Sequence, residues 1–296
     1  MSRHWDASNI ADQTGKFAIV TGANTGLGKE TARVLASKGA NVTLAVRNTE
    51  SGERAATDIR AAHPKALVAV ARLDLSSLES IRQFAETYGA EHDQLHYLVN
   101  NAGVMVPPYG KTEDGFELQF GTNHLGHFAL TGRLLPLLKA TSGSRITTVS
   151  SASHNFGNID FDDLAWENRP YRPNHAYGDS KIANLYFTYE LARRLNGDGV
   201  TVTAAHPGWT ATDLQRHSGL FRFFNPILAQ KIPMGALPTL RAAVDPDAEG
   251  GSYFGPGGMG GIRGYPVKVQ SNELSRDESI ARRLWDVSEK LTGVTF

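Results

Sequence analysis

Short runs of apolar residues without helical spacing alternate along the chain with longer segments in which apolar residues recur every three or four positions. The short runs predict buried strands at residues 16–21, 41–46, 66–71, 95–99, 145–149, 201–205 and, more briefly, 252–254. The segments with helical spacing predict helices at residues 29–38, 49–62, 77–88, 116–138, 177–195, 235–244 and 273–291. This alternation is typical of a parallel sheet built from βαβ units. We therefore predict an α/β fold with a doubly wound, mostly parallel sheet of about seven strands flanked by helices.

No repeat, low-complexity segment or linker divides the 296 residues, so we predict one domain over residues 1–296. Residues 155–174 are polar and contain prolines, which is typical of a surface excursion. Residues 210–235 have few acids and carry many aromatic and aliphatic side chains between positions 220 and 228. This segment could be a lid over an apolar substrate, part of an oligomer face, or ordinary core. Residues 250–296 form a C-terminal extension that begins with a glycine-rich stretch.

Composition excludes several classes of function. Lysine and arginine together number 30, as do aspartate and glutamate, so no overall field recruits nucleic acid or an anionic membrane. The absence of cysteine excludes disulfides, thiolate catalysis and cysteine–zinc sites, and it fits the reducing cytoplasm in which we expect the protein to reside. We expect no metal site. The polar N-terminus and the lack of any run of about 18 apolar residues predict neither a signal peptide nor a membrane span.

A glycine-rich turn joins the first strand to the first helix. Residues 22–28 read Gly-Ala-Asn-Thr-Gly-Leu-Gly, the spacing G-x-x-x-G-x-G. Glycines allow the backbone to approach a pyrophosphate closely, and the helix N-terminus supplies free N–H groups for it. The turn is not a Walker loop, because Lys29 is followed by Glu30 rather than Ser or Thr. It therefore predicts a dinucleotide site, with a plain strand-to-helix turn as the alternative.

The end of the second strand indicates which dinucleotide binds. Arg47 directly follows this strand, and no carboxylate occurs until Glu50. An acid at this place would hold a ribose 2′-hydroxyl, whereas an arginine accommodates a 2′-phosphate. We therefore predict NADP(H) rather than NAD(H), with a solvated surface arginine as the alternative.

Tyr177 and Lys181 are the candidate acid/base pair. They are four residues apart on a predicted helix, which puts their Cβ atoms about 5–6 Å from one another. A nearby cation favours phenolate, and we expect Lys181 to lower the Tyr177 pKa from its usual value of about 10. Such a phenol could exchange a proton near neutral pH. The alternative is an exposed tyrosine and lysine on a helix surface.

Together these motifs resemble the short-chain dehydrogenase/reductase family. More narrowly, the chain is similar to the retinol-dehydrogenase-like branch, which also resembles the light-dependent protochlorophyllide reductases. The matching residues follow the family order over about residues 15–213, and they are Thr21 to Gly28, Asp74, Leu75, Asn100 to Gly103, Asn123, Ser150, Ser151, Tyr177, Lys181, Pro207 and Gly208. Phe254 and residues 280–287 extend the likeness toward the C-terminus. The resemblance implies a single-domain Rossmann fold.

The resemblance also implies roles for individual residues. Tyr177 would donate or accept the proton at the substrate oxygen, and Lys181 would lower its pKa and hold the nicotinamide ribose. Ser151 would hydrogen-bond the substrate oxygen, and Asn123 would anchor a water in the proton relay. The implied cofactor-binding residues are Gly22, Asn24, Thr25, Gly26, Leu27, Gly28, Arg47, Asp74, Leu75, Asn101, Ala102, Gly103, Tyr177, Lys181, Pro207, Gly208, Thr210 and Thr212.

One departure from the wider family concerns the serine pair. Ser151 lies 26 residues before Tyr177, about twice the common gap, although the retinol-dehydrogenase-like branch resembles this chain in having such an insertion. Ser150 and Ser151 point to opposite faces of an extended strand, so only one of them can serve. The sequence leaves that choice open.

The function expected from this resemblance is hydride transfer between NADP(H) and a small hydrophobic alcohol, aldehyde or ketone. One alternative is a reductase of a conjugated C=C bond, although the light-dependent relatives rely partly on cysteine and this chain has none. Another is a non-catalytic protein that senses NADP(H). We expect no nucleic-acid partner, and we expect a homodimer or homotetramer formed through the helices at 116–138 and 177–195.

Overall fold

The computed structural model describes residues 4–210 and 229–296, and within them eight strands form one sheet. The strands are β1 (Phe17–Thr21), β2 (Asn41–Val46), β3 (Leu67–Arg72), β4 (Tyr97–Asn100), β5 (Arg145–Val149), β6 (Thr201–Ala205), β7 (Tyr253–Gly258) and β8 (Arg263–Val269). Their order across the sheet is β3-β2-β1-β4-β5-β6-β7-β8. Only the β7–β8 pair among them is antiparallel. The predicted α/β fold with a mostly parallel sheet is confirmed.

The strand order reverses at β1, which pairs with β2 on one side and with β4 on the other. From β1 the chain moves outward through β2 to β3, then returns to β4 and continues toward β8. At such a reversal the connections leave the sheet in opposite directions, and a crevice opens beyond the carboxyl ends of the two strands. The fold therefore provides a ligand crevice above β1 and β4.

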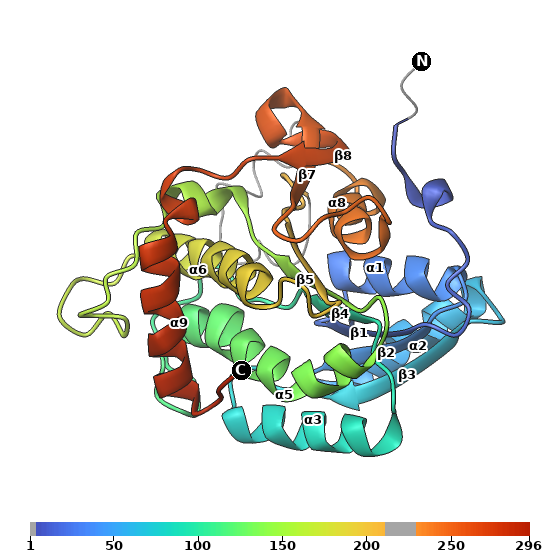
Figure 1. The fold of residues 1–296 in the computed structure, drawn as a ribbon, viewed down its shortest axis with the longest axis horizontal. Helices are drawn as coiled ribbons and strands as arrows, with labels where there is room; N and C mark the ends of the chain where they lie inside the picture. The colour runs from blue at the N-terminus through green and yellow to red at the C-terminus, as the bar shows by residue number, and fades with distance from the viewer. Residues whose placement is uncertain (1–3, 211–228) are drawn as a thin grey trace.

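Helices cover both faces of the sheet (Figure 1). They are α1 (Gly26–Ser37), α2 (Thr49–Ala62), α3 (Leu78–Glu91), α4 (Leu118–Phe120), a π-helical turn (Gly121–Leu125), α5 (Gly126–Ala140), α6 (Pro173–Arg194), α8 (Ile232–Val244) and α9 (Glu278–Thr292). Side chains alternate along each strand, so Ile19 packs against α3 and α5 whereas Ala18 and Val20 pack against α1, α2 and α8. Two apolar cores, one on each face, therefore hold the sheet in place.

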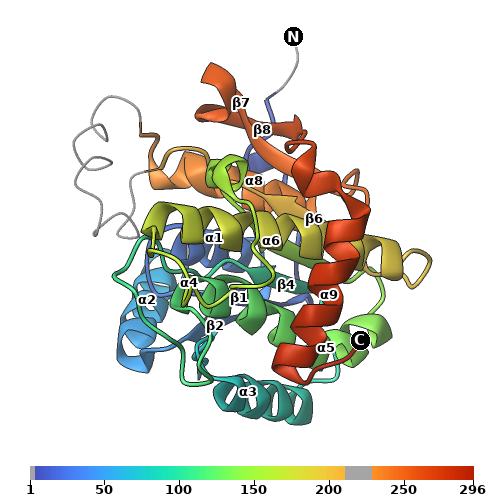
Figure 2. The same ribbon diagram turned by 90° about the vertical axis from the view of Figure 1, so that its left-hand side faces the viewer.

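The C-terminal helix α9 crosses α6 at a steep angle, as Figures 1 and 2 both show, and it contacts both α6 and α5. Trp285 of α9 stacks on Phe187 at 6.0 Å between ring centroids and meets Phe128 edge-on at 5.1 Å. The C-terminal residue Phe296 packs against the same Phe128 ring at 4.7 Å. The C-terminal segment thus covers apolar side chains of both α5 and α6.

The sequence prediction missed the eighth strand. The edge strand β8 contains Pro266, a residue without a backbone donor that argues against a strand in the middle of a sheet. An edge position tolerates it, because one side of the strand has no partner. The helix predicted at 116–138 is observed as a continuous helical segment from Leu118 to Ala140, with a π-helical turn between α4 and α5. The aromatic stretch between 220 and 228 lies outside the described residues.

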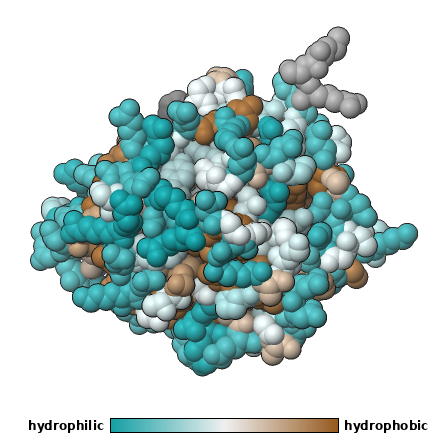
Figure 3. Space-filling model, viewed as in Figure 1, coloured by the Kyte–Doolittle hydropathy of each residue, from teal (hydrophilic) through white to brown (hydrophobic). Residues whose placement is uncertain are grey.

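The face seen in Figure 3 is largely hydrophilic, with hydrophobic side chains scattered over it rather than gathered in one broad patch. Among the helices that the structure describes, none combines the length and the apolar character needed to cross a bilayer.

Candidate functional site

A cavity of about 920 Å³ opens at the carboxyl ends of the central strands. Most of the predicted site residues line it, and they are Gly22, Asn24, Thr25, Gly26, Leu27, Gly28, Arg47, Asp74, Leu75, Asn101, Ala102, Gly103, Ser151, Tyr177, Lys181, Pro207, Gly208 and Thr210. Asn123 lies just behind the wall, and Thr212 is outside the described residues. The cavity is large enough for a dinucleotide and a small substrate together.

The glycine turn after β1 is fitted against the end of β4. Gly22 has a φ of 65°, and a Cβ there would lie 2.9 Å from Ala102. A Cβ on Gly28 would lie 2.5 Å from the Asn101 amide nitrogen. The Thr21 hydroxyl accepts hydrogen bonds from the backbone N–H groups of Asn101 and Ala102, both at 2.9 Å. Larger side chains at positions 22 and 28 would therefore collide with the end of β4, and glycine allows the turn to pack this closely.

The start of α1 faces the same space. This helix begins at Gly26, and Gly26, Leu27 and Gly28 all line the cavity. The first backbone N–H groups of a helix have no intrahelical partner, and the helix dipole adds partial positive charge there. The turn and the helix start together are suited to an anion such as a pyrophosphate.

Arg47 lies at the rim of the cavity, directly after β2. Its side chain is exposed, and it forms no ion pair with any residue that the structure describes. The nearest acid in sequence, Glu50, is paired with Arg54 at 2.6 Å. On the neighbouring strand end, the Asp74 carboxylate accepts hydrogen bonds from Ser76, at 3.0 Å from the backbone and 2.7 Å from the hydroxyl. Arg47 is therefore free to meet a phosphate.

Asn123 lies in the π-helical turn, a local geometry that is frequent at functional sites. Its Oδ1 accepts a hydrogen bond from the Val104 N–H at 2.8 Å, and its Nδ2 donates to the Val104 carbonyl and the Ser180 hydroxyl, both at 2.9 Å. A Cβ on Gly103 would touch both Asn123 Oδ1 at 3.1 Å and Lys181 Nζ at 3.6 Å. Asn123 thus packs beside Lys181, and both of its amide hydrogens are already used.

Tyr177 and Lys181 project from successive turns of α6 into the cavity. The Lys181 Nζ lies 5.6 Å from the centroid of the Tyr177 ring and donates to the Val149 carbonyl at 3.1 Å. Ser151 follows β5, which lies directly beneath this part of α6. Its hydroxyl interacts with the Tyr177 phenol. Residues from two distant parts of the chain thus meet at one wall of the cavity.

The two serines have different surroundings. The Ser150 hydroxyl donates to the backbone carbonyl of Lys181 at 2.8 Å, and Ser150 is 2% exposed. The Ser151 hydroxyl instead accepts from the Ser153 N–H at 3.1 Å, beside the Tyr177 phenol. Ser151 is therefore the serine placed to meet a substrate next to Tyr177.

Burial has the largest effect on the pKa values of Tyr177 and Lys181. It raises the pKa of Tyr177 to about 12, with the Ser151 hydroxyl opposing this shift, and it lowers the pKa of Lys181 to about 8. The Tyr177 pKa therefore lies above its usual value of about 10 and not below it, because burial removes the phenolate from water. Tyr177 is thus a protonated phenol at neutral pH. An effect of Lys181 on this pKa stays a prediction.

The sequence missed several residues on the far side of the cavity. His154, Trp209 and Tyr253 line it, as do Ile262 and Val267 from the β7–β8 region. The His154 ring bonds the Ser151 carbonyl at 2.7 Å and so supports the turn after β5. The missed strand β8 provides part of this wall, so the failure to predict β8 also hid its contribution to the site.

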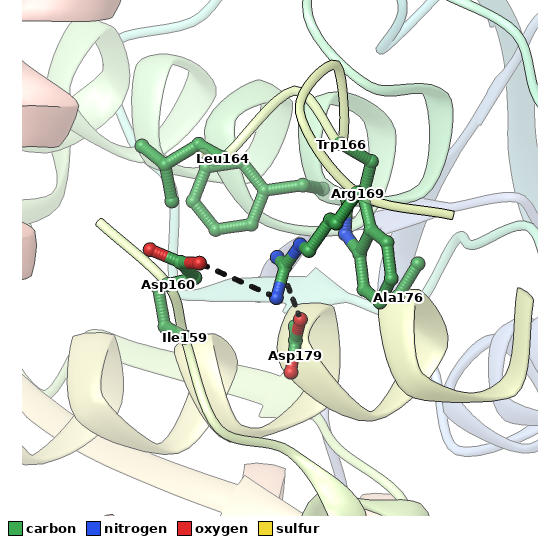
Figure 4. Close-up of a pocket in the computed structure, with 8 residues that line it drawn as sticks. Ile159, Asp160, Leu164, Trp166, Arg169, Ala176 and Asp179 are labelled. Carbon is green, nitrogen blue, oxygen red and sulfur yellow. Dashed lines mark ion pairs between the residues drawn. The ribbon is translucent and has the colours of Figure 1, made fainter. Parts of the chain in front are cut away.

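A cluster of charged residues outside the cavity lies against α6, on the side of residues 157–172 (Figure 4). Asp179, two residues after Tyr177, is buried there and accepts a hydrogen bond from the Asn158 N–H at 2.8 Å. The Arg169 guanidinium lies 4.0 Å from Asp179. Burial raises the pKa of the Asp179 carboxyl to about 7, although the bond from Asn158 and the charge of Arg169 both act against this shift.

This raised pKa predicts a pH-dependent stability. The folded chain keeps a proton on Asp179 that the unfolded chain has lost, so the free energy of unfolding falls as pH rises toward 7. Between pH 5 and 8, wild type is expected to lose about 3 kcal/mol relative to Asp179→Asn, at about 1.4 kcal/mol per pH unit below the folded pKa. Urea unfolding of both proteins across this range measures the difference. A difference that does not change with pH would contradict the prediction.

The arrangement agrees with comparisons to known proteins. A family model described as short chain dehydrogenase matches residues 16–220. Retinol dehydrogenase 12 of Mus musculus is 46% identical over 288 residues, which cover 95% of this chain and 88% of the relative. Retinol dehydrogenase 13 of Homo sapiens is 46% identical over 291 residues, which cover 95% of this chain and 85% of the relative.

Two solved structures are also similar to this chain. The crystal structure of an uncharacterised protein from Mycobacterium paratuberculosis has a TM-score of 0.85 and 41% identity, with 99% of each chain covered. An NADP active-site complex of RhlG from Pseudomonas aeruginosa has a TM-score of 0.66 and 25% identity, covering 82% of this chain and 94% of the other.

Proposed function

Because the chain belongs to the short-chain dehydrogenase family, we propose that it transfers a hydride between NADP(H) and a hydrophobic alcohol, aldehyde or ketone, with Tyr177 as the general acid/base. The observation that carries the proposal is the meeting of Ser151, Tyr177 and Lys181 at one wall of a cavity whose other end is the glycine turn. The proposed acid/base group and the proposed nucleotide site would therefore share one cavity.

The chemistry of the cavity fits NADP(H). The glycine turn and the start of α1 line the cavity, and the free N–H groups of the helix start would stabilise a pyrophosphate. Arg47 would pair with the 2′-phosphate, since no carboxylate neutralises it within the described chain. Asp74 and Leu75 would border the adenine, and Lys181 would hold the nicotinamide ribose. When bound, the nicotinamide supplies or accepts the hydride.

The protein's own contribution is a proton and its placement. With a pKa of about 12, Tyr177 holds its proton at neutral pH and can donate it to the oxygen of a carbonyl substrate. Ser151 would donate a hydrogen bond to the same oxygen and stabilise the charge that develops on it. The ammonium group of Lys181 would stabilise the phenolate that remains. Oxidation of an alcohol requires that phenolate from the start, so it should be favoured at higher pH.

The lining of the cavity supports an apolar substrate. Beyond Ser151 and Tyr177 the wall includes the apolar residues Met105, Pro107, Trp209, Ile262 and Val267. Burial of such surface against a hydrocarbon chain is worth about 25 cal/mol per Å². The names of the relatives, retinol dehydrogenases 12 and 13, refer to a hydrophobic alcohol and support the same substrate class.

The proposal is tested by following NADPH absorbance with a series of aldehydes. We expect consumption of NADPH with decanal and all-trans-retinal, and much weaker consumption with acetaldehyde, because acetaldehyde buries little apolar surface. Binding of NADPH without turnover of any aldehyde or ketone would contradict the proposal and favour a sensor of NADP(H). Reduction of a conjugated C=C bond, detected by product analysis, would favour the other alternative.

A further inference from the structure

The segment between Ser151 and Tyr177 folds back onto the first turns of α6. The backbones of Gly157 and Gly178 meet so closely that a Cβ on Gly157 would lie 2.4 Å from the Gly178 carbonyl oxygen. The next residue, Asn158, donates its N–H to Asp179 at 2.8 Å. The segment that follows Ser151 is therefore attached to one side of α6 near Tyr177.

Apolar contacts continue this attachment. Ile159, Phe161 and Leu164 pack against an apolar cluster that includes Phe120 of α4 and Ile182 of α6. The insertion is thus a surface excursion, as its polar sequence predicts, that is attached to α6 by a few apolar side chains. These three apolar residues pack inward, whereas Phe156 is exposed.

Arg169 is the centre of the polar contacts. Its guanidinium lies 3.4 Å from Asp163, 3.6 Å from Asp160 and 4.0 Å from Asp179, and it stacks at 3.7 Å over the Trp166 ring. Figure 4 shows Arg169 reaching from its loop between Asp160 and Asp179, with Trp166 beside it. The space left among these side chains is only about 10 Å³, about that of a single water. The cluster therefore joins parts of the chain and does not hold a ligand.

We propose that Asp179 and Arg169 are positioning residues that fix the segment following Ser151 against the first turns of α6. This position allows the hydroxyls of Ser151 and Tyr177 to hydrogen-bond to the same substrate oxygen. Asn158 is seven residues after Ser151, and Asp179 is two residues after Tyr177. The Asn158–Asp179 hydrogen bond thus joins the chain just after Ser151 to the helical turn that carries Tyr177. Arg169 contacts the same Asp179 carboxylate. This inference rests on the proposed function.

The charge arrangement supports a positioning role over a stabilising one. Asp179 is faced by Arg169, Asp160 and Asp163 from the insertion and by Glu117 from the residue before α4, so acids outnumber the one cation. Glu117 is itself buried and accepts a hydrogen bond from the Tyr171 hydroxyl at 2.9 Å. Burying a carboxylate in such surroundings costs stability. A costly charge beside the reacting residues is expected where function requires it.

The test compares Asp179→Ala, which removes the acceptor of the Asn158 N–H, with Glu190→Ala, a matched change on the same helix. Glu190 is also a buried carboxylate with arginine partners, Arg193 at 2.7 Å and Arg194 at 2.8 Å, but it lies 13 residues from Tyr177. With decanal and NADPH, we expect Asp179→Ala to lower kcat about tenfold through misplacement of the reacting groups, without a change in KM or NADPH affinity. Glu190→Ala should leave kcat unchanged.

Substitutions of Arg169 provide the rescue. Arg169→Lys keeps the charge and should retain most of the activity, whereas Arg169→Gln should lower kcat as Asp179→Ala does. The double variant Asp179→Ala/Arg169→Gln should lose less than the sum of the two single losses, since the two side chains share a contact. An unchanged kcat in Asp179→Ala, or an equal fall in Glu190→Ala, would overturn the proposal. So would additive losses in the double variant.

Hydrogen exchange separates this inference from the proposed function, because it requires no turnover. We expect backbone amides in residues 151–160 to exchange about fivefold faster in Asp179→Ala than in wild type or Glu190→Ala. If wild type reduces no aldehyde but exchange is faster in Asp179→Ala, the proposed function is contradicted and the positioning contact is supported. If exchange is unchanged in Asp179→Ala, the positioning contact is contradicted whatever the activity.

Discussion

Tyr177→Phe is expected to lower the turnover number by a factor of about 10²–10⁴ while NADPH affinity stays the same, since general acid/base help typically contributes this much. The substitution removes only the phenolic hydroxyl from a side chain that is 6% exposed, so the ring still fills its place. Initial rates of aldehyde reduction give the turnover number, and fluorescence titration gives the NADPH dissociation constant.

Tyr186→Phe is the matched control. Tyr186 lies nine residues further along α6, is also buried, and does not line the cavity. Loss of its hydroxyl should leave turnover unchanged. If Tyr177→Phe turns over as fast as wild type, or if both substitutions reduce turnover equally, Tyr177 is not the acid/base group.

Arg47→Ala is expected to weaken NADPH binding by about 10–100-fold, because a hydrogen bond to a charged group is worth about 1.5–3 kcal/mol. NADH lacks the 2′-phosphate, so its dissociation constant should stay nearly unchanged. Since Arg47 is exposed and makes no ion pair with the described residues, the substitution should not disturb the fold. Isothermal titration with both nucleotides measures the two constants.

Arg54→Ala serves as the control for general charge effects. Arg54 is also exposed and lies on the neighbouring helix α2, but it is paired with Glu50. It should affect neither nucleotide. An equal loss of NADPH and NADH affinity in Arg47→Ala would mean that Arg47 does not contact the 2′-phosphate.

The sequence predicted the part of the fold that local pattern determines. Strands buried on both faces read as continuous apolar runs, and the turn at 22–28 carries glycines where a Cβ would collide with Ala102 or Asn101. The residues around the cavity could be predicted because they follow the strands that end there. The edge strand β8 could not, since Pro266 is incompatible with a central strand and nothing local reveals an edge.

Features that depend on distant packing were beyond the sequence. The spacing of Tyr177 and Lys181 predicts proximity, but the direction of the Tyr177 pKa depends on how completely the fold buries it. The choice between Ser150 and Ser151 depends on a bond to the Lys181 carbonyl, 31 residues away. Likewise, the meeting of Arg169 and Asp179 follows from the folding of the insertion onto α6.

The most direct test is a crystal structure of the protein with NADP⁺ bound. We predict the pyrophosphate on the turn at residues 22–28, the ribose within hydrogen-bonding reach of Lys181 Nζ, and the nicotinamide ring beside the hydroxyls of Ser151 and Tyr177. A dinucleotide bound elsewhere, or a ring out of contact with those two hydroxyls, would contradict hydride transfer at this site.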